Sequence, residues 1–545
     1  MSIAPPRLYR NARVLLPEPA AQGTDAVATV GDRIVAVGTV EACRAALPSG
    51  AEEVDLAGHA LAPGFVDAHL HPLVMCVFEQ QLVLDRCESV AEVLEAVADA
   101  ARATEAGRTI VGFQLDDAVL AERRMPTSVE LDRAGDRRHV VLVRRDGHHA
   151  VASNSALRAV GYDRVGSDPA GGRIDRHPDG TPTGLVREIA VAPLLGLMAE
   201  VTFDELEIGL ASWSQRLVSQ GITAISAICQ TTAEGPAVEA GVLEAMGWSV
   251  LVDRVPFDVQ TILIADGPGA VAEAQATALH RPEAGRRVDA VKLFLDGTLG
   301  GHTACMHAPF SDHPASSGIA TMTNDHAYQR MEAAHLAGLQ VCIHAIGDRA
   351  NRDAAELYDR LLHQHPGSHR HRVEHASVLD ERTVELFAEH QITAVVQPIS
   401  LRSEHHWLNQ RLGPDRIQRT YPYRTLLDAG IPVAGSSDAP IEATEVIAAM
   451  AAAVDRPDLA PAQALSGTAA LKLFTSGASA AQRTEDRLGS IAVGLRADLV
   501  VLDGDPTSVA PERLGQIGVV ATIIGGRHVH GQLQRSPHTE GRRNP

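Results

Sequence analysis

The stretch Gly64-Phe-Val-Asp-Ala-His-Leu-His-Pro72 (residues 64–72) decides how this chain folds. Phe65 and Val66 begin a short apolar run, typical of a buried strand, that ends in His69 and His71. Because side chains alternate along a strand, both imidazoles point to the same side. A parallel strand of an α/β barrel presents its chemistry at its carboxyl end, where two imidazoles suit a borderline metal such as zinc. In a chain with 25 histidines this pair alone is weak evidence.

The segments around this strand predict a barrel with a smaller β domain. Beyond it, apolar strands alternate with helical patterns, which is typical of a β/α barrel, here over residues 63–485. Residues 7–62 instead indicate short strands with tight turns, expected as a small antiparallel sheet, and similar segments return near the end. We therefore expect a composite β domain from residues 1–62 and 486–535, with a disordered polar tail at 536–545.

Residues 73–200 are too long for a single β/α step of the barrel. They contain an amphipathic helical pattern at residues 89–107 and a run rich in Gly, Pro and Asp at residues 168–184, expected as a loop or hairpin. We predict that this segment is an insertion over the mouth of the barrel, where binding specificity tends to reside.

The composition excludes several classes of protein. A formal net charge of −20 and only 3% aromatic residues argue against binding to nucleic acid or to anionic membranes. The amino terminus lacks the apolar core of a secretory signal, and no stretch reaches the roughly eighteen apolar residues of a membrane span. The six cysteines form no C-x-x-C pair, which indicates reduced thiols. These features predict a cytoplasmic protein that acts on a small molecule.

Four further titratable residues each lie at the end of an apolar β stretch, where a barrel collects side chains into one site. They are Lys292, His344, His375 and Asp438. A buried ammonium is costly, so Lys292 either pairs with a carboxylate such as Asp296 or is neutralised. Taken singly, a strand-end His or Asp is more often a cap, a turn former or a core residue. Together with the histidine pair, the six residues in this order predict a metal site.

Several longer motifs carry a resemblance to a known family. The segments RRDGHHAVASNSAL, VKLFLDGTLGGHTACM, IHAIGDRAN, HRVEHASVL and GSSDAP resemble the amidohydrolase superfamily of metal-dependent hydrolases, in particular the branch of the N-substituted formamide deformylases. The likeness runs from Leu8 to Gln532. It implies a distorted (β/α)8 TIM barrel, a β-sandwich built from both chain termini and a homodimer as a compatible assembly.

The resemblance also implies a centre of one or two divalent metal ions, usually zinc. The implied ligands are His69, His71 and Asp438 for the more buried ion, and His344 and His375 for the more exposed one. Lys292, carboxylated on N6 to a carbamate, is the implied bridge. A carbamate is an anionic oxygen ligand, so this modification resolves the burial of the lysine. The ligand types alone leave zinc, iron, manganese and cobalt open.

A mechanism follows from such an ion. It lowers the pKa of bound water, and the resulting hydroxide attacks a polarised carbonyl. Asp438 is the expected general base, which takes the proton and delivers it to the departing amine. The alternative for Asp438 is a turn residue before Pro440.

Three residues are candidates for binding the substrate. His148 and Asn154 lie in the expected insertion and match the family branch, although such residues equally stabilise loops. Trp407 could offer an aromatic wall, or it could serve in plain packing.

Three functional hypotheses follow. The first is hydrolysis of an amide-type C–N bond, of the N-formyl or N-acyl amine type. The second is deamination, or opening of a cyclic amide, on the same barrel; resemblance to single-metal deaminases predicts no bridging lysine. The third is a catalytically silent scaffold protein, which predicts the loss of ligands, and all six are present.

Overall fold

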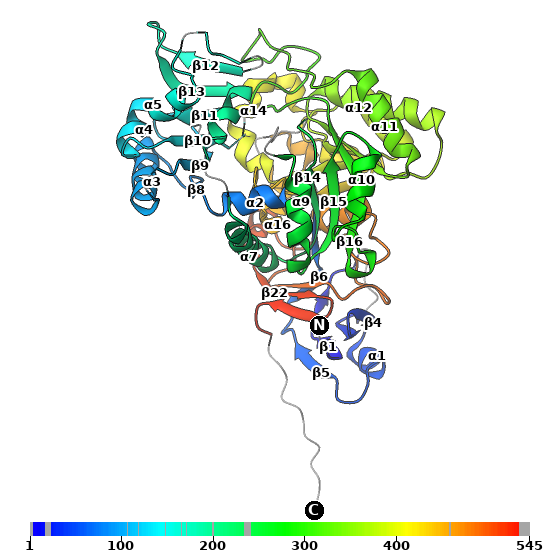
Figure 1. Cartoon of the computed structure of the whole chain (residues 1–545). Helices are drawn as coiled ribbons and strands as arrows, with labels where there is room; N and C mark the ends of the chain where they lie inside the picture. Colours follow the sequence, from blue (N-terminus) through cyan, green and yellow to red (C-terminus); the bar gives the residue numbers. More distant parts are fainter. Residues whose placement is uncertain are drawn as a thin grey trace, which may run out of the picture.

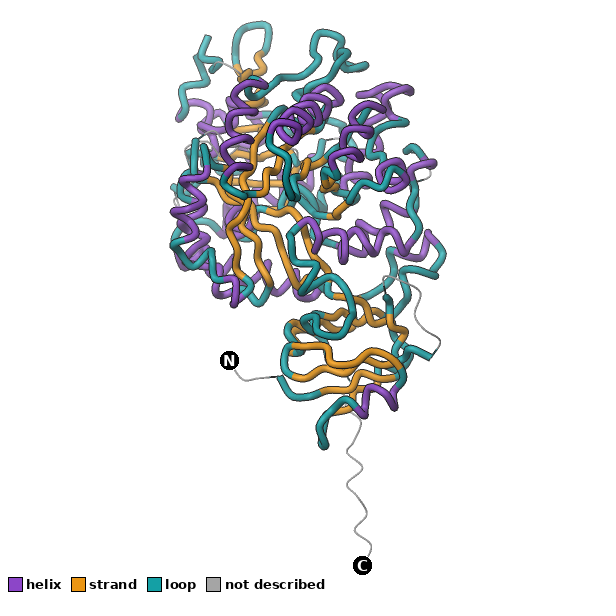
Figure 2. The backbone as a smooth tube through the Cα atoms, turned by 90° about the vertical axis from the view of Figure 1, so that its right-hand side faces the viewer, coloured by secondary structure: helices purple, strands orange, loops and turns teal. Residues whose placement is uncertain are grey.

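The computed structural model describes residues 4–16, 23–105, 107–117, 119–145, 147, 149–164, 166–169, 172–198, 201–233, 241–456 and 459–533. Its centre is a sheet of eight strands in which all neighbours pair in parallel (Figures 1 and 2). In sheet order the strands are β7 (Phe65–Leu70), β14 (Ile222–Gln230), β15 (Asp258–Ile264), β16 (Arg286–Phe294), β17 (Gln340–Ala345), β18 (Arg372–His375), β19 (Thr393–Val396) and β20 (Val433–Gly435). The predicted barrel is therefore present, and it is nearly closed.

The first and last barrel strands meet at a short seam. Among the described residues, the one ladder contact there is an isolated parallel bridge between Leu70 and Ala439, just beyond the end of β20. The amide of Asp438 donates to the carbonyl of His69 at 2.8 Å, and the amide of His71 donates to the carbonyl of Ala439 at 2.8 Å. The backbone that closes the barrel thus belongs to three of the predicted ligands and one neighbour.

Helices cover the outside of the barrel and bury its apolar strands. They include α2 (Pro72–Phe78), α7 (Phe203–Ser219), α9 (Glu244–Leu251), α10 (Pro268–Gln275), α11 (Asn324–Leu336), α12 (Asp348–Gln364), α13 (Glu381–His390), α14 (Ser400–Ile417), α15 (Tyr423–Asp428), α16 (Val446–Val454), α17 (Gly467–Lys472) and α18 (Ala478–Ala481). A capping box at Thr202 and Glu205 starts α7, and Asp380 caps α13. Between α7 and α9, the rings of Trp213 and Trp248 lie 6.3 Å apart in the largest apolar cluster.

A separate six-stranded sheet occupies the expected insertion. Its strands are β8 (Leu82–Val83), β9 (Ile110–Leu115), β10 (Val140–Arg144), β11 (His149–Ala152), β12 (Gly172–Arg176) and β13 (Pro182–Glu188), with α3 (Val90–Ala103), α4 (Ser128–Ala134) and α5 (Asn154–Ala159) against it. The predicted amphipathic helix is α3, and the run at 168–184 contributes to the hairpin of β12 and β13. This sheet reaches the carboxyl end of the barrel, because the side-chain amide of Gln114 donates to the carbonyl of Ile441 at 3.3 Å.

Two smaller sheets are formed by the first and the last strands of the chain (Figure 2). One is formed by β1 (Arg7–Arg10), β3 (Ala26–Val30), β4 (Arg33–Gly38) and β5 (Glu52–Asp55); the other by β2 (Arg13–Val14), β6 (Ala60–Pro63), β21 (Leu499–Leu502), β22 (Val519–Ile524) and β23 (Arg527–His530). The expected small antiparallel sheet over residues 7–62 is present in part, since β3 pairs antiparallel with β1 and β4. The expectation is wrong for two other pairs, because β1 pairs with β5 in parallel and β2 pairs with β6 in parallel. A hairpin and helix α1 (Val40–Ala45) separate β1 from β5, and such a crossover permits parallel pairing.

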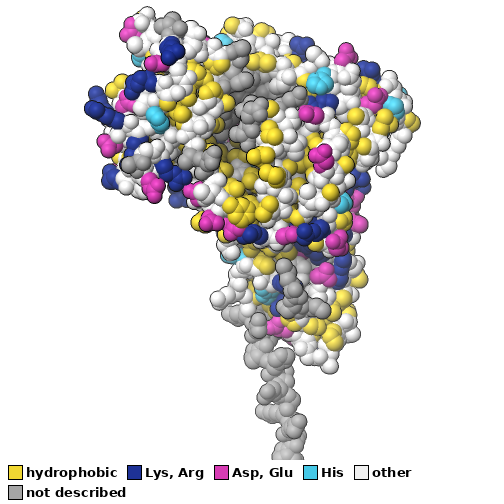
Figure 3. Space-filling model, viewed as in Figure 1, with side chains coloured by type: hydrophobic (Ala, Val, Ile, Leu, Met, Phe, Trp, Pro, Cys, Tyr) yellow, Lys and Arg dark blue, Asp and Glu magenta, His cyan; other side chains and the backbone are white. Residues whose placement is uncertain are grey.

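The surface and the cysteines complete the description. On the face drawn in Figure 3, basic and acidic side chains are interspersed, and apolar side chains gather where α7 and α9 lie. In this region Ile208, Met246 and Val250 are each more than half exposed. All six cysteines are free thiols, five of them buried. Within the described ranges, no helix has the length and apolar character needed to cross a membrane.

Candidate metal centre

The six residues predicted as ligands lie together at the carboxyl end of the barrel. The Oδ1 atom of Asp438 lies 3.1 Å from Nε2 of His69 and 3.3 Å from Nε2 of His71. The Nζ atom of Lys292 lies 3.5 Å from Nε2 of His69. The ring of His375 lies 5.3 Å from that of His69 and 4.5 Å from that of His344, centroid to centroid. One ligand atom each from His69, His375 and Asp438 fall within 4.8 Å of one another.

Strand geometry explains how most of these side chains reach the site. Asp67 and His69 lie on one side of β7, and His71 follows in the same phase. The Asp67 carboxylate accepts hydrogen bonds from the amides of His69, at 3.1 Å, and Ser437, at 3.0 Å, so it ties β7 to the chain before Asp438. In the pairing of β16 with β17, His344 lies opposite Phe294. Phe294 is two residues after Lys292 on β16, so Lys292 and Phe294 share one side of that strand.

Two ligands depend on a left-handed backbone. Glu374 points into the barrel, so an extended chain would turn the next residue, His375, outward. Instead His375 has φ of 75° and Asp438 has φ of 60°. This conformation costs roughly 1–2 kcal/mol for a residue with a side chain. At His375 and Asp438 this cost is met by the surrounding structure, which holds both side chains toward the site.

The hydrogen bonds of the imidazoles fix which nitrogen is free. His375 donates from Nδ1 to Oε1 of Gln397 at 2.9 Å, and the Gln397 amide nitrogen in turn donates to Ser436 at 2.9 Å. His344 donates from Nε2 to the carbonyl of Gly297 at 3.1 Å. Since these partners accept through oxygen, Nε2 of His375 and Nδ1 of His344 keep a lone pair.

His69 is oriented in the same way by a carboxylate. Its Nδ1 lies 2.5 Å from Oε2 of Glu374, which leaves Nε2 for the site. Neutral imidazoles with one free nitrogen, next to a carboxylate, are the donor set that zinc and similar metals bind. The residues of this site therefore fit a divalent transition metal.

Burial sets the charges of the site. It lowers the pKa of His69, and it holds the pKa of His375 well below its usual value with help from neighbouring His344. Burial by itself raises the pKa of Asp438, but the facing His69 and His71 outweigh it and place that pKa well below the usual range. These shifts favour the neutral, metal-binding forms of His69 and His375 and the ionised form of Asp438.

Lys292 is unusual in this chain. The sequence has 48 basic residues, of which only Lys292 and Lys472 are lysines, and Lys472 is exposed. Lys292 is 1% exposed, and its burial lowers its pKa. Its Nζ atom lies 5.1 Å from the centre of the Phe294 ring. The suggested partner Asp296 instead accepts from the amides of Cys305 and Gly347, each at 2.8 Å, and lies 3.3 Å from Nε2 of His344.

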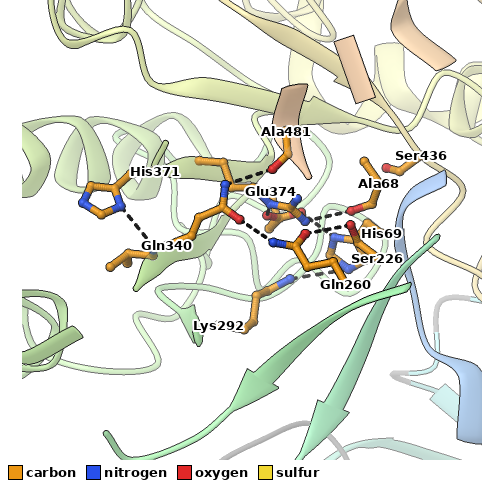
Figure 4. A network of polar contacts seen from close by, with 12 residues as sticks. Ala68, His69, Ser226, Gln260, Lys292, Gln340, His371, Glu374, Ser436 and Ala481 are labelled. Atoms are coloured by element: carbon orange, nitrogen blue, oxygen red, sulfur yellow. Dashed lines mark hydrogen bonds and ion pairs between the residues drawn. The ribbon is translucent and has the colours of Figure 1, made fainter. Parts of the chain in front are cut away.

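Buried polar side chains inside the barrel bond to one another and to His69; Glu374 and Arg372 are the central pair (Figure 4). Nε of Arg372 donates to Glu374 at 2.5 Å, and its NH2 group donates to the carbonyl of Ala68 at 2.7 Å. Arg372 and Glu374 are both fully buried, and Arg372 is the main group that lowers the pKa of Glu374 against the effect of burial. Sequence reasoning missed this pair. The signal was present, because residues 372 and 374 are two apart in a strand and so share its inner side.

The three predicted substrate residues are less informative. His148 lies outside the described residues. The Asn154 amide donates to Asp132 of α4 at 2.8 Å, a contact within the insertion. Trp407 packs partly buried against the barrel core, with the Arg411 guanidinium 5.0 Å from its ring centre.

Sequence reasoning did not find a further polar group near Asp438. Arg145 of the insertion pairs with Glu442, four residues after Asp438, and Glu442 also accepts from Ser403 of α14. Glu404, next to Ser403, accepts a hydrogen bond from Tyr421. Burial raises the pKa of Glu404 to about 8.

Comparisons with known proteins identify the family and agree with the barrel fold. The sequence profile of the amidohydrolase family matches residues 52–530. A Bacillus subtilis (strain 168) protein named as an amidohydrolase, YtcJ, is 30% identical over 88% of this chain and 90% of its own length. The N-substituted formamide deformylase of Arthrobacter pascens is 27% identical over 95% of this chain and 96% of its own. A crystal structure of an uncharacterized metal-dependent hydrolase from Pyrococcus furiosus superposes with a TM-score of 0.70 and 26% identity, covering 92% of this chain and all of that one.

Proposed function

This chain belongs to the amidohydrolase family, and on that premise we propose that it hydrolyses an amide-type C–N bond of a small molecule with the help of a divalent metal. The observation that carries the proposal is the meeting of six candidate ligands from separate barrel strands and loops. Three of the imidazoles keep one free nitrogen there, because their other nitrogen is already bonded. A catalytically silent relative has no need to keep this set together.

The residues assigned to the metal are those already described. His69, His71 and Asp438 would hold one ion; His344 and His375 would hold a second; Lys292, as a carbamate, would bridge them. When bound, a metal such as zinc supplies Lewis-acid chemistry, which lowers the pKa of water and polarises a carbonyl. Burial lowers the pKa of Lys292 and so favours its neutral amine. This supports the carbamate, because only the neutral amine adds CO2.

Asp438 is the residue that moves the proton. Its Oδ1 atom faces His69 and His71, so we assign the other carboxylate oxygen to the proton transfer. It accepts a proton from the attacking water as the oxygen adds to the carbonyl carbon. The C–N bond then breaks, and Asp438 returns the proton to the departing nitrogen, so that water is consumed and an acid and an amine form.

The substrate class rests on similarity alone. The deformylase of Arthrobacter pascens, at 27% identity over nearly the whole chain, supports N-formyl or N-acyl amines as the first substrates to try.

The test is an activity panel with the zinc-loaded enzyme. We expect turnover of N-formyl or N-acyl amines, loss of turnover on chelation and recovery on adding zinc. Asp438→Asn should remove turnover, whereas Asp428→Asn, an exposed carboxylate on α15, should behave like the wild type. Turnover of cyclic amides or amino-heterocycles alone would replace this proposal with ring opening or deamination. Full activity after complete removal of metal would refute metal dependence.

A further inference from the structure

A second group of metal-ligand side chains lies on the outer helices. Asp359 and His363 are one turn apart on α12, and His390 is the last residue of α13. One ligand atom from each lies within 4.8 Å of the other two. Among the described residues, only this group and the barrel centre meet that criterion.

Two neighbouring histidines, His371 and His335, do not compete for this role, because both nitrogens of each ring are already used. The segment HQHPGSHRH spans residues 363–371 and brings several imidazoles to this end of the barrel. The amide of Val341 donates to Nδ1 of His371, whose Nε2 lies 2.9 Å from Nδ1 of His335. His335 donates onward from Nε2 to the carbonyl of His365 at 3.0 Å. This proton-ordered chain leaves no lone pair on His371 or His335 for a metal.

The distances within the outer group suit a small cation. For ligands about 2.1 Å from a tetrahedral metal, the donor atoms lie about 3.4 Å apart. Oδ1 of Asp359 is 3.3 Å from Nδ1 of His363, close to this spacing, and 2.7 Å from Nε2 of His390, a pair that has to open slightly. The side chain of His363 is 64% exposed, which leaves the group open to solvent for entry of an ion and a completing water.

The surrounding electrostatics favour a cation. His363 lies in the last turn of α12 and His390 in the last turn of α13, and helix carboxyl ends carry partial negative charge. In a β/α barrel the helices run back against the strands, so this end lies opposite the catalytic mouth. Figure 4 shows His371, the last residue of the same segment, on the side of the drawn polar contacts opposite His69.

We propose that Asp359, His363 and His390 form a second metal site, for a divalent first-row transition metal such as Zn²⁺, that ties α12 to α13. Two imidazoles and a carboxylate are nitrogen and oxygen donors of the kind that zinc binds, and calcium and magnesium prefer oxygen alone. The metal replaces the protons that His363 donates to the Asp359 carbonyl and that His390 shares with the Asp359 carboxylate. Binding therefore weakens as the pH falls.

The experiment counts zinc bound to the full-length protein by equilibrium dialysis with metal analysis. We expect His363→Ala and His390→Ala each to bind one equivalent less than the wild type, with kcat unchanged. The matched control is His405→Ala, an exposed histidine on α14 whose ring bonds only to its own helix. It should bind zinc like the wild type.

A second readout is thermal unfolding of protein whose catalytic centre is already loaded. Further zinc should raise Tm in the wild type and in His405→Ala but not in His363→Ala. Equal zinc content in the wild type, His363→Ala and His390→Ala would overturn the proposal. An equal loss in His405→Ala would also overturn it, because binding would then belong to surface histidines in general.

Discussion

The Nδ1 atom of His69 lies 2.5 Å from a carboxylate oxygen of Glu374, a residue 305 positions further along the chain. Glu374 in turn accepts from Arg372, so one buried carboxylate serves both an imidazole of the metal centre and a fully buried guanidinium. The orientation of His69 and the stability of the barrel interior therefore depend on the same side chain.

Replacement of Glu374 tests this double role. Glu374→Gln keeps the shape but leaves Arg372 without its counter-charge, which should lower the free energy of unfolding by about 3–5 kcal/mol. Urea unfolding measures this change. Glu385→Gln, an exposed carboxylate paired with Arg382 on α13, should cost less than about 1 kcal/mol. A Glu374→Gln protein as stable as that control would show that Arg372 does not need the charge.

Replacement of Lys292 separates stability from metal binding. Lys292→Met removes a buried amine and keeps its apolar stem, so the metal-free protein should be at least as stable as the wild type. Its metal content should fall, and kcat/KM should drop by at least 100-fold, about 2.7 kcal/mol. Thermal unfolding of metal-free protein and metal analysis of loaded protein measure the two effects.

The carbamate itself can be observed because the chain has only two lysines. With ¹³C-bicarbonate, the wild type and Lys472→Met should show one carbamate signal by NMR, and Lys292→Met should show none. A wild-type enzyme that is fully active and carries no such signal would contradict the bridging role.

Glu404 predicts a pH-dependent stability. Burial raises its pKa to about 8 from the value of 4.5 expected in the unfolded chain, and nearby Glu442 adds to the rise while Tyr421 and Arg145 oppose it. The folded state therefore holds this proton more tightly. The contribution of Glu404 to the free energy of unfolding is complete below pH 4.5, declines as the pH rises through 8 and changes little beyond. Glu404→Gln should flatten the fall in unfolding free energy between pH 5 and about 8. Identical pH profiles for the two proteins would exclude Glu404 as the source.

The contact between Arg145 and Glu442 links the insertion to the loop that follows Asp438. Arg145→Ala leaves the buried Glu442 carboxylate without its counter-charge and with only the hydrogen bond from Ser403, so we expect kcat/KM to fall about tenfold, or about 1.4 kcal/mol. Arg124→Ala removes a more exposed pair with Glu130 inside the insertion and should leave kcat/KM unchanged. Steady-state kinetics compare the two, and equal losses would show that only the stability of the insertion matters.

The sequence predicted the centre of the molecule better than its surroundings. His69 and His71 could be assigned to one face because alternation along a strand is regular. The direction of the His375 side chain could not be predicted in this way. His375 follows Glu374, which points inward, and it reaches the site only because its backbone is left-handed. The contacts of Arg145 and Glu404 depend on how the insertion and α14 pack, which no local pattern encodes. The parallel pairing of β1 with β5 was missed because turn signals do not report which strands become neighbours.

The seam of the barrel has a consequence for biosynthesis. β7 is the first barrel strand to leave the ribosome and β20 is the last, and the backbone bonds that join them belong to His69, His71 and Asp438. The contact with the largest sequence separation in the barrel is thus also the one that completes its chemistry. A nascent chain that stops before residue 433 holds most of the barrel strands but no assembled centre, so catalytic competence arrives in a single late step of translation.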